Sequence, residues 1–514
     1  MNKYLYSLLL LFFAIGSIAC SDDEKVNFNP VTDTISPISR LQANATDKLN
    51  EIQLSWINPS SETLCKVEIA YEMENYTSRY SPNPIIIDTK PGQLESYLLS
   101  VPRYGKYKIS VVAISRFGKR SAAVKTEGTP LQKDEGENNE ENQTDIESIF
   151  IGKADTLFNA MNKLFWVTPW GWAGSYPRGD GYWEGTALIW GYGAAFSGYT
   201  ALREATQASV DYKNKLLVYD NLYFNKIEKF INSPDGKAKA YAVWPGSGDQ
   251  RLYDDNAWVG LDMIDLYKQT NIRGYLDRAI LVWDYLQVGT DDYTGGGIYW
   301  DERHDAKHTC STAPGAVLSA KIYLATQEQK YLDQCIAYYN WLLKRLQDPL
   351  DYLFWDNCKE DEKGNIVVSK PKYAYNSGQP LQVAVLLYKI TNEEKYLVDA
   401  RRIAEAIYNK WSYRMFSQVL GEEIQILENG HVWFYNIAFR GFVELYSVDK
   451  SAKKYIELYA NTLRHVWLIG KDKETNLLST DIREGKSEKS YDILHQGAYV
   501  EMLSRLSLID IQEK

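Results

Sequence analysis

The stretch QPLQVAVLLYKITNEEKYLVDARRIAEAIYNK, residues 379–410, decides the fold class of most of this 514-residue chain. Its apolar side chains recur at three- and four-residue spacing, as at Leu381, Val385 and Tyr388, which is the period of an α-helix with one buried face. The pattern breaks off at residue 391 and resumes at 393. We therefore expect two helices, 379–391 and 393–410, joined by a tight turn as an antiparallel hairpin.

The same periodicity recurs through the whole C-terminal part of the chain, after residue 144. Six such hairpins predict an all-α (α/α)6 barrel, in which inner and outer helices alternate around a closed ring. The rival architecture is a superhelical repeat array, which the sequence disfavours because no segment repeats at a fixed period. The predicted helices begin near residues 145, 184, 219, 255, 272, 311, 328, 379, 393, 432, 451 and 492.

A different pattern precedes residue 131. Apolar and polar residues alternate in EIQLSWINP (51–59), KVEIAYE (66–72) and YKISVVAIS (107–115), which predicts β-strands with one buried face. These segments resemble a fibronectin type III module, a seven-strand sandwich, over residues 35–130. The acidic stretch LQKDEGENNEENQT (131–144) cannot bury enough apolar surface to fold, so we expect a linker. The chain is thus predicted to be multi-domain, with a small all-β sandwich before a helical domain over 145–514.

The N-terminus has the pattern of an export signal. Lys3 precedes an apolar stretch over 8–18, and the small residues before Cys20 mark a cleavage site. Residues 1–20, with the acidic run that follows, resemble the signal peptide of a bacterial surface lipoprotein, in which the Cys is lipidated. Residues 21–34 would then be a tether, with Cys20 anchoring the protein to the outer membrane at the cell surface. The alternative is an ordinary secretory peptide that ends in an incidental Cys.

Composition and charge limit the classes of ligand. Lys and Arg number 57 against 67 Asp and Glu, so the formal net charge is −10, and the chain contains 39 Tyr and 15 Trp. A protein of this charge has no electrostatic footprint for a nucleic-acid backbone. Acidic, Trp- and Tyr-rich composition favours a neutral polyhydroxy ligand.

The remaining cysteines and the histidines do not predict a metal site. Without a CxxC pair, Cys65, Cys310, Cys335 and Cys358 are expected to be free thiols. Two histidines four residues apart, at 304 and 308, lack the Glu of an HExxH motif and are expected to lie at the surface. No metal or cofactor is therefore expected.

Clusters of aromatic, glycine and polar residues precede every second predicted helix. Because alternate helices share one layer of the barrel, these clusters are expected to meet at one rim, where loops on a rigid scaffold carry function. The alternative is that each cluster only turns the chain. The clusters are YPRGDGYWEG (176–185), WPGSGDQRLYDDN (244–256), TGGGIYWDERHDAKHTCS (294–311), KYAYNSGQP (372–380), ENGHVWFYN (428–436) and SYDILHQGAY (490–499).

Within these clusters, Asp254 and Asp255 are the best candidates for acid–base chemistry. Adjacent residues have Cα atoms ~3.8 Å apart, which allows the carboxyls to approach the ~5–5.5 Å that retaining glycoside hydrolysis requires. Proximity to a like charge would raise the pKa of the carboxyl that must donate a proton. The alternative is a capping role, because Asp is favoured at helix N-termini.

The segment around this pair resembles the signature of glycoside hydrolase family 76, the α-1,6-mannanases. Four further segments match that family in the same order, and the resemblance spans roughly residues 146–510. The matching segments are YDDNAW (253–258), GGIYW (296–300), KHTCSTAP (307–314), YNSG (375–378) and FRG (439–441). Tyr299, His308 and Ser377 depart from the usual Trp, Asn and Gln.

The resemblance implies an (α/α)6 fold and retaining, endo-acting hydrolysis of α-1,6-mannosidic bonds in a mannan backbone. Asp254 would be the nucleophile and Asp255 the general acid/base, in a monomer without cofactor that acts on α-mannan or manno-oligosaccharides. Aromatic rings, amides and Lys suit contacts with sugar C–H groups and hydroxyls. The expected sugar contacts are Trp183, Tyr253, Asn256, Trp300, Lys307, Asn376 and Trp433.

Two other functions remain open on the sequence alone. One is a lipid-anchored glycan-binding protein without turnover, which would not need two crowded carboxylates. The other is a different (α/α)6 activity, such as an exo-mannosidase or an unsaturated-glucuronyl hydrolase. The size of the products separates these activities from endo cleavage.

Overall fold

The computed structural model describes residues 34–46, 51–74, 84–101, 105–131, 150–167, 170–178, 186–207, 210–234, 236–246 and 250–509. The chain divides into two units, Met1–Lys133 and Asp134–Lys514, each with a hydrophobic core of its own. The predicted signal peptide with Cys20, the tether up to residue 33 and the linker after residue 131 lie outside the described residues. Among the helices described, none combines the length and apolar character needed to cross a bilayer.

The N-terminal unit consists of two antiparallel sheets that share one core. The first sheet has the order β1 (Ser39–Ala45), β2 (Glu51–Ile57), β5 (Leu94–Ser100), and the second the order β4 (Ile85–Asp88), β3 (Leu64–Met73), β6 (Tyr107–Ser115), β7 (Val124–Gly128). Trp56 from the first sheet packs in the same core as Ile69 and Val111, which pair across β3 and β6. The predicted alternation of buried and exposed residues is therefore confirmed in these strands.

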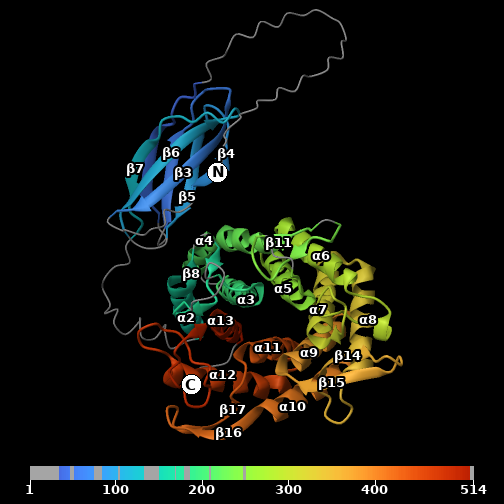
Figure 1. Cartoon of the computed structure of the whole chain (residues 1–514). Helices are drawn as coiled ribbons and strands as arrows, with labels where there is room; N and C mark the ends of the chain where they lie inside the picture. The colour runs from blue at the N-terminus through green and yellow to red at the C-terminus, as the bar shows by residue number, and fades with distance from the viewer. Residues whose placement is uncertain are drawn as a thin grey trace, which may run out of the picture. The chain divides into compact units, whose positions relative to one another are not determined.

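The C-terminal unit consists of consecutive helix pairs, with one helix of each pair on the inside (Figure 1). The inner helices are α3 (Ile189–Ala205), α5 (Tyr253–Thr270), α7 (Thr309–Thr326), α9 (Ala374–Thr391), α11 (Val432–Val448) and α13 (Ile493–Ser507). The outer helices are α2 (Phe150–Phe165), α4 (Val210–Ile227), α6 (Arg273–Val288), α8 (Gln329–Arg345), α10 (Glu394–Trp411) and α12 (Lys453–Gly470). The described residues thus contain the helices that the periodicity predicted, with α11 starting at residue 432 as expected. However, α4 begins at Val210 and not near residue 219, and α9 begins at Ala374 and not at residue 379.

Each inner helix packs against the next inner helix along the chain, and α13 packs against α3. Inner helices are buried on all sides, so that every residue from Asn376 to Leu387 of α9 is buried. The outer helix α10 buries only one face, with Tyr396, Ala400, Ile403 and Ile407 at helical spacing. The pattern of buried residues along a helix therefore distinguishes an inner helix from an outer one.

Glycine lets neighbouring inner helices approach closely. A Cβ on Gly497 of α13 would lie 2.5 Å from the carbonyl oxygen of Ala194 on α3. A Cβ on Gly198 of α3 would lie 2.8 Å from the carbonyl oxygen of Gly497. Any larger residue at this crossing would push α3 and α13 apart.

Several short strands and turns, most of them not predicted from the sequence, connect the helices. The strands β14 (Trp355–Glu360) and β15 (Ile366–Lys372) form a hairpin that β13 (Lys307–His308) extends, and β16 (Ser412–Ser417) pairs with β17 (Glu422–Leu427). Two-residue strands pair as β8 (Trp166–Val167) with β9 (Gly171–Trp172), β10 (Ser175–Tyr176) with β18 (Tyr491–Asp492), and β11 (Ile231–Asn232) with β12 (Ala240–Tyr241). Single 3-10 turns are η2 (Glu228–Phe230), η3 (Tyr293–Gly295) and η4 (Lys450–Ala452). The four described cysteines, Cys65, Cys310, Cys335 and Cys358, are free thiols, as expected.

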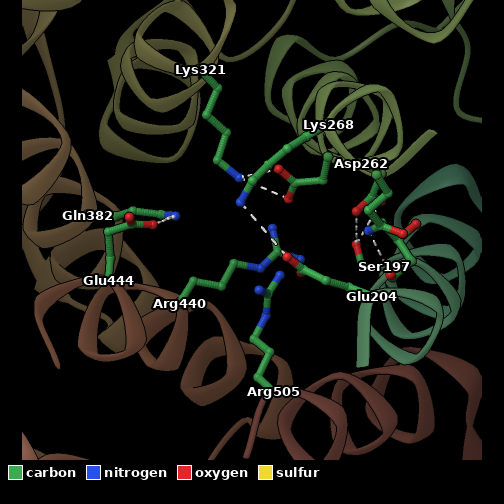
Figure 2. Close-up of polar contacts among 12 residues, drawn as sticks. Ser197, Glu204, Asp262, Lys268, Lys321, Gln382, Arg440, Glu444 and Arg505 are labelled. Atoms are coloured by element: carbon green, nitrogen blue, oxygen red, sulfur yellow. Dashed lines mark hydrogen bonds and ion pairs between the residues drawn. The ribbon is translucent and has the colours of Figure 1, made fainter. Parts of the chain in front are cut away.

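Charged side chains from the inner helices point toward one another inside the helical unit (Figure 2). The guanidinium of Arg440 on α11 and that of Arg505 on α13 each donate to Glu501 at 2.7 Å. Lys321 on α7 donates to both carboxylate oxygens of Asp265 on α5, at 2.7 and 2.8 Å. Buried charges of this kind require such partners, because an unpaired charge in a protein interior is costly. We call these residues, with Ser197, Asp262, Gln382 and Glu444, the inner charge cluster.

Within the inner charge cluster, Asp262 has a carboxyl whose pKa lies far from its usual value. Its two oxygens lie 2.9 and 2.7 Å from the Ser197 hydroxyl oxygen, whose single O–H is shared between them, and Asp262 is buried. Burial raises the pKa of Asp262 to about 8, although Arg440 opposes the shift. Asp262 follows Asp254 by eight residues on α5, which places it about 12 Å further along the helix.

Candidate active site

The N-terminal ends of the inner helices lie together at one rim of the helical unit. Trp433, at the start of α11, has its ring centroid 5.1 Å from that of Trp258 on α5 and 5.4 Å from that of Trp190 on α3. The Tyr375 ring at the start of α9 lies 5.8 Å from Trp433. Elements up to 240 residues apart in the chain therefore meet where the sequence clusters were expected to converge.

A loop from the α6–α7 connection fixes the start of α5. The backbone N–H of Tyr253 donates to the carbonyl of Trp300 at 2.9 Å, and an antiparallel bridge pairs Leu252 with Asp301. The indole Nε1–H of Trp300 then donates to Oδ2 of Asp254 at 3.1 Å. Trp300 and Asp254 are therefore parts of one site, although they belong to different sequence clusters.

The glycine run before Trp300 shapes this loop. Gly295, Gly296 and Gly297 all have positive φ angles, which residues other than glycine rarely adopt. A Cβ on Gly297 would also lie 2.7 Å from the ring of Trp341 on α8. The loop can thus turn tightly against α8 and deliver Trp300 to Asp254.

Asp254 is held by several hydrogen-bond donors. Its Oδ1 accepts the backbone N–H of Asp255 at 2.9 Å, its Oδ2 accepts the Trp300 indole, and the Cys310 thiol on α7 bonds to the same carboxylate. Burial raises the pKa of Asp254 to about 6, and these hydrogen bonds oppose the shift because they favour the charged form. Asp254 is the second residue of α5 and not its N-cap, which is Leu252, but its bond to the Asp255 N–H satisfies one amide of the first helical turn.

Asp255 has a different environment. Its side chain is only 7% exposed, and none of the described residues donates a hydrogen bond to its carboxyl. Burial, followed by the adjacent charge of Asp254, raises the pKa of Asp255 well above its usual range. Two neighbouring carboxyls are thus separated in acidity, since one has donors that stabilise its charge and the other has none.

A third carboxylate, which was not predicted from the sequence, lies near the starts of α7 and α9. Asp356, on β14, accepts from the amide of Asn376 at 3.1 Å and from that of Asn357 at 2.9 Å. The ladder shifts register here, so that two residues of β15 lie opposite Asp356. Its charge acts on Tyr375 and on Cys310, as does that of Asp254, so Asp356 lies near the pair.

The structure corrects three of the expected sugar contacts. Tyr253 is completely buried, and its ring stacks on Tyr285 at 4.7 Å. Asn256 is also completely buried, because its amide bonds to both the N–H and the carbonyl of Tyr241, at 2.7 and 2.8 Å. These side chains hold α5 in position and present no surface to a ligand.

Lys307 is the third correction. Its ammonium is completely buried, 2.8 Å from Asp291 and 2.9 Å from the carbonyl of Gly297, with the Tyr299 ring centroid at 3.7 Å. The ammonium group donates to the loop carbonyls and to Asp291, so its N–H groups are not available to a sugar hydroxyl. Lys307 therefore ties down the loop that carries Trp300.

The other expected contacts lie at the rim or outside the described residues. Trp300 is half-buried beside Asp254, and Trp433 is 4% exposed in the aromatic group described above. Asn376 is buried, and its Oδ1 has no hydrogen-bond partner among the described residues, although its Nδ2 donates to Asp356. Trp183 lies in a segment that the structure does not describe.

A mostly helical unit that carries two adjacent carboxyls in unequal environments, beside aromatic and amide side chains, has the groups that a glycoside hydrolase uses. The model of glycosyl hydrolase family 76 matches residues 152–511. The chain belongs to this family. The helical unit therefore carries the family's catalytic domain, as the resemblance in the sequence implied.

Solved structures agree with this assignment. A family 76 glycoside hydrolase from a bovine Bacteroides thetaiotaomicron strain is 35% identical over 92% of this chain and 99% of its own, with a TM-score of 0.68. A family 76 mannosidase from B. thetaiotaomicron VPI-5482 is 41% identical over 70% of this chain and 98% of its own, with a TM-score of 0.67. An α-1,6-mannanase from Salegentibacter sp. HEL1_6, 21% identical over 70% of this chain and 99% of its own, has the same fold at a TM-score of 0.56. A comparison with curated proteins finds no match.

Proposed function

We propose that this protein is a retaining, endo-acting hydrolase of α-1,6-mannosidic bonds in a mannan backbone, with Asp254 as nucleophile and Asp255 as general acid/base. The observation that carries the proposal is the unequal hydrogen bonding of the two carboxyls. Asp254 has three donors and keeps its charge, whereas Asp255 has none among the described residues and keeps its proton.

In the first step, an oxygen of Asp254 attacks the anomeric carbon while Asp255 gives its proton to the departing glycosidic oxygen. This step breaks the glycosidic bond and forms a covalent mannosyl–Asp254 ester. In the second step, Asp255 takes a proton from water, whose oxygen attacks the same carbon and releases Asp254. Both carboxyls return to their starting states, so no metal or cofactor is needed.

The relatives support the substrate. An inactive variant of the Salegentibacter mannanase, with two consecutive aspartates replaced, is solved in complex with α-1,6-mannotriose. For this chain we propose Trp300, Asn376, Trp433 and Trp183 as sugar contacts. Asn376 has a buried carbonyl oxygen without a hydrogen-bond partner among the described residues, and such an acceptor is usually satisfied by a donor from a ligand or water.

The architecture and location are also proposed. We infer that the ring of helix pairs is a closed (α/α)6 barrel, supported by the packing of α13 on α3. The two-sheet unit would be a fibronectin type III-like spacer, and Cys20 would attach a monomeric protein to the outer membrane at the cell surface. Cleavage there would supply manno-oligosaccharides for uptake.

The test is incubation of the full chain with linear α-1,6-mannan, followed by product analysis over time. We expect oligosaccharides of several lengths early in the reaction and an α-configured product by NMR. Mannose as the sole early product would instead indicate exo action. Binding of the polymer without any product would favour a glycan-binding protein.

A further inference from the structure

His308 occupies a distinctive place in this site. It is the last residue of β13, directly before α7, and its ring centroid lies 6.0 Å from that of Trp300. The same strand carries Lys307, which is buried beneath the loop, so the alternation of a strand turns His308 to the opposite side. His308 is half-buried there.

Neither ring nitrogen of His308 has a hydrogen-bond partner among the described residues. Unlike Nδ1 of His431 and of His495, the His308 nitrogens are also absent from the buried polar atoms without partners. They are therefore not completely enclosed by protein, and they lie next to the ring that bonds to Asp254. Burial lowers the pKa of His308, while Asp356 and Asp301 oppose the shift, so the imidazole is neutral at pH 7.

A neutral imidazole offers one N–H donor and one nitrogen acceptor. A sugar hydroxyl has the same two capacities, so the two groups are complementary. The Trp300 indole next to His308 adds an apolar surface of the kind that packs against sugar C–H groups. The charge of Asp356 acts on His308, and Asn376 on α9 holds this carboxylate through a 3.1 Å hydrogen bond.

We propose that His308 is a substrate-contacting residue, which hydrogen-bonds a hydroxyl of the mannosyl unit that lies against Trp300 next to the cleaved bond. This inference rests on the proposed function. It assigns His308 to binding: the imidazole contributes to affinity for the glycan, whereas Asp254 and Asp255 carry out bond cleavage.

The test uses the full chain carrying Asp254→Asn and Asp255→Asn, with α-1,6-mannotriose as the probe in isothermal titration calorimetry. In this background, His308→Phe keeps a ring beside Trp300 but removes both hydrogen-bonding atoms. We expect the Kd to rise about tenfold. His308→Gln, which keeps a donor and an acceptor, should restore the Kd to within about threefold of the parent.

Steady-state kinetics on α-1,6-mannan with active enzyme gives an independent readout. His308→Phe should raise KM about tenfold and change kcat less than about threefold. The control is His304→Phe in the same loop, because His304 is exposed and stacks on Tyr299 rather than on Trp300. This control should leave KM unchanged.

An unchanged Kd and KM in His308→Phe, with an active parent, would overturn this inference and leave the proposed function standing. A fall in kcat at constant KM would overturn it as well. A parent that neither binds mannotriose nor cleaves mannan would overturn the proposed function together with it. Matching thermal melting curves establish that the variants are folded.

Discussion

Trp300 donates its indole N–H to Oδ2 of Asp254 at 3.1 Å, which fixes one oxygen of the carboxylate proposed as the nucleophile. The backbone of the same tryptophan accepts the N–H of Tyr253, so one residue orients both the carboxylate and the helix that carries it. A residue proposed as a sugar contact thus also positions the carboxylate proposed as the nucleophile.

We expect Trp300→Phe to keep most of the apolar surface but to remove the donor. Loss of a hydrogen bond to a charged group corresponds to about 1.5–3 kcal/mol, or roughly 10- to 100-fold in kcat/KM. The acidic limb of the pH–rate profile should also move to higher pH, because Asp254 loses a group that stabilises its charge. A profile with an unmoved acidic limb would contradict the role of this hydrogen bond.

The two aspartates should respond differently to the leaving group. Asp254→Ala is expected to lose activity on every substrate, since no ester can form. Asp255→Ala should lose at least about 100-fold on mannan but much less in the first step on an aryl α-mannoside, whose leaving group needs little protonation. The matched control is Asp292→Asn, in the exposed Asp291–Asp292 dipeptide, which should retain activity. Equal losses of Asp255→Ala on both substrates would contradict the role of Asp255 as the general acid.

The pH dependence of activity follows from the same pair. Asp254 must be ionised, so activity should fall as the pH drops below about 6, the pKa to which burial raises this carboxyl. Asp255 must be protonated, and its strongly raised pKa extends activity toward alkaline pH. The pH profile of kcat/KM on mannan checks this expectation, and full activity at pH 4 would refute it.

From the raised pKa of Asp262 we expect the stability of the folded protein to depend on pH. This dependence does not involve the catalytic pair. The Asp262 pKa of about 8 in the folded protein exceeds the usual carboxyl value of 3.8, so the folded state binds the proton more tightly than the unfolded state does. Stability from this group is complete below pH 4 and is lost as the pH rises from about 4 to 8. We expect Asp262→Asn to melt at increasingly higher temperature than the parent over this range. A constant difference in Tm between pH 4 and 8 would contradict the prediction.

The crossing of α3 and α13 provides a matched pair of glycines. Gly497→Ala would place a methyl group against the Ala194 carbonyl, and overpacking of this kind costs about 1–3 kcal/mol. Gly193 lies in α3 with nothing within 4 Å of its would-be Cβ, so Gly193→Ala should stabilise by about 0.5–1 kcal/mol. Urea titration of both variants measures the difference. A stabilising Gly497→Ala would contradict the close packing of these helices.

Local pattern was enough to predict most of the helices and to single out the acidic pair as a candidate. Apolar spacing reports directly on burial, which is why the start of α11 at Val432 was predicted correctly, and the pairing of β3 with β6 follows the predicted alternation. Asp254 stood out because a second carboxylate adjoins it in a segment that also resembles a known family.

Contacts between distant segments could not be predicted. Asp356 lies in a hairpin of mixed polar sequence, and its link to Asn376 exists only in the folded chain. Lys307 and Asn256 have the chemistry of sugar ligands, but Asp291, loop carbonyls and the Tyr241 backbone satisfy them first. Residue type identifies what a side chain is able to bind, and tertiary packing decides whether it is free to do so.

The ion pair between Arg440 and Glu501 has a consequence for how the protein is made. Glu501 belongs to α13, and the same helix packs against α3, more than 280 residues earlier in the chain. Until α13 is synthesised, Arg440 lacks its Glu501 partner and α3 lacks the helix that packs against it. A chain truncated just before α13 therefore lacks both the partner of Arg440 and the helix that covers α3. We expect such truncated products to be readily degraded by proteases.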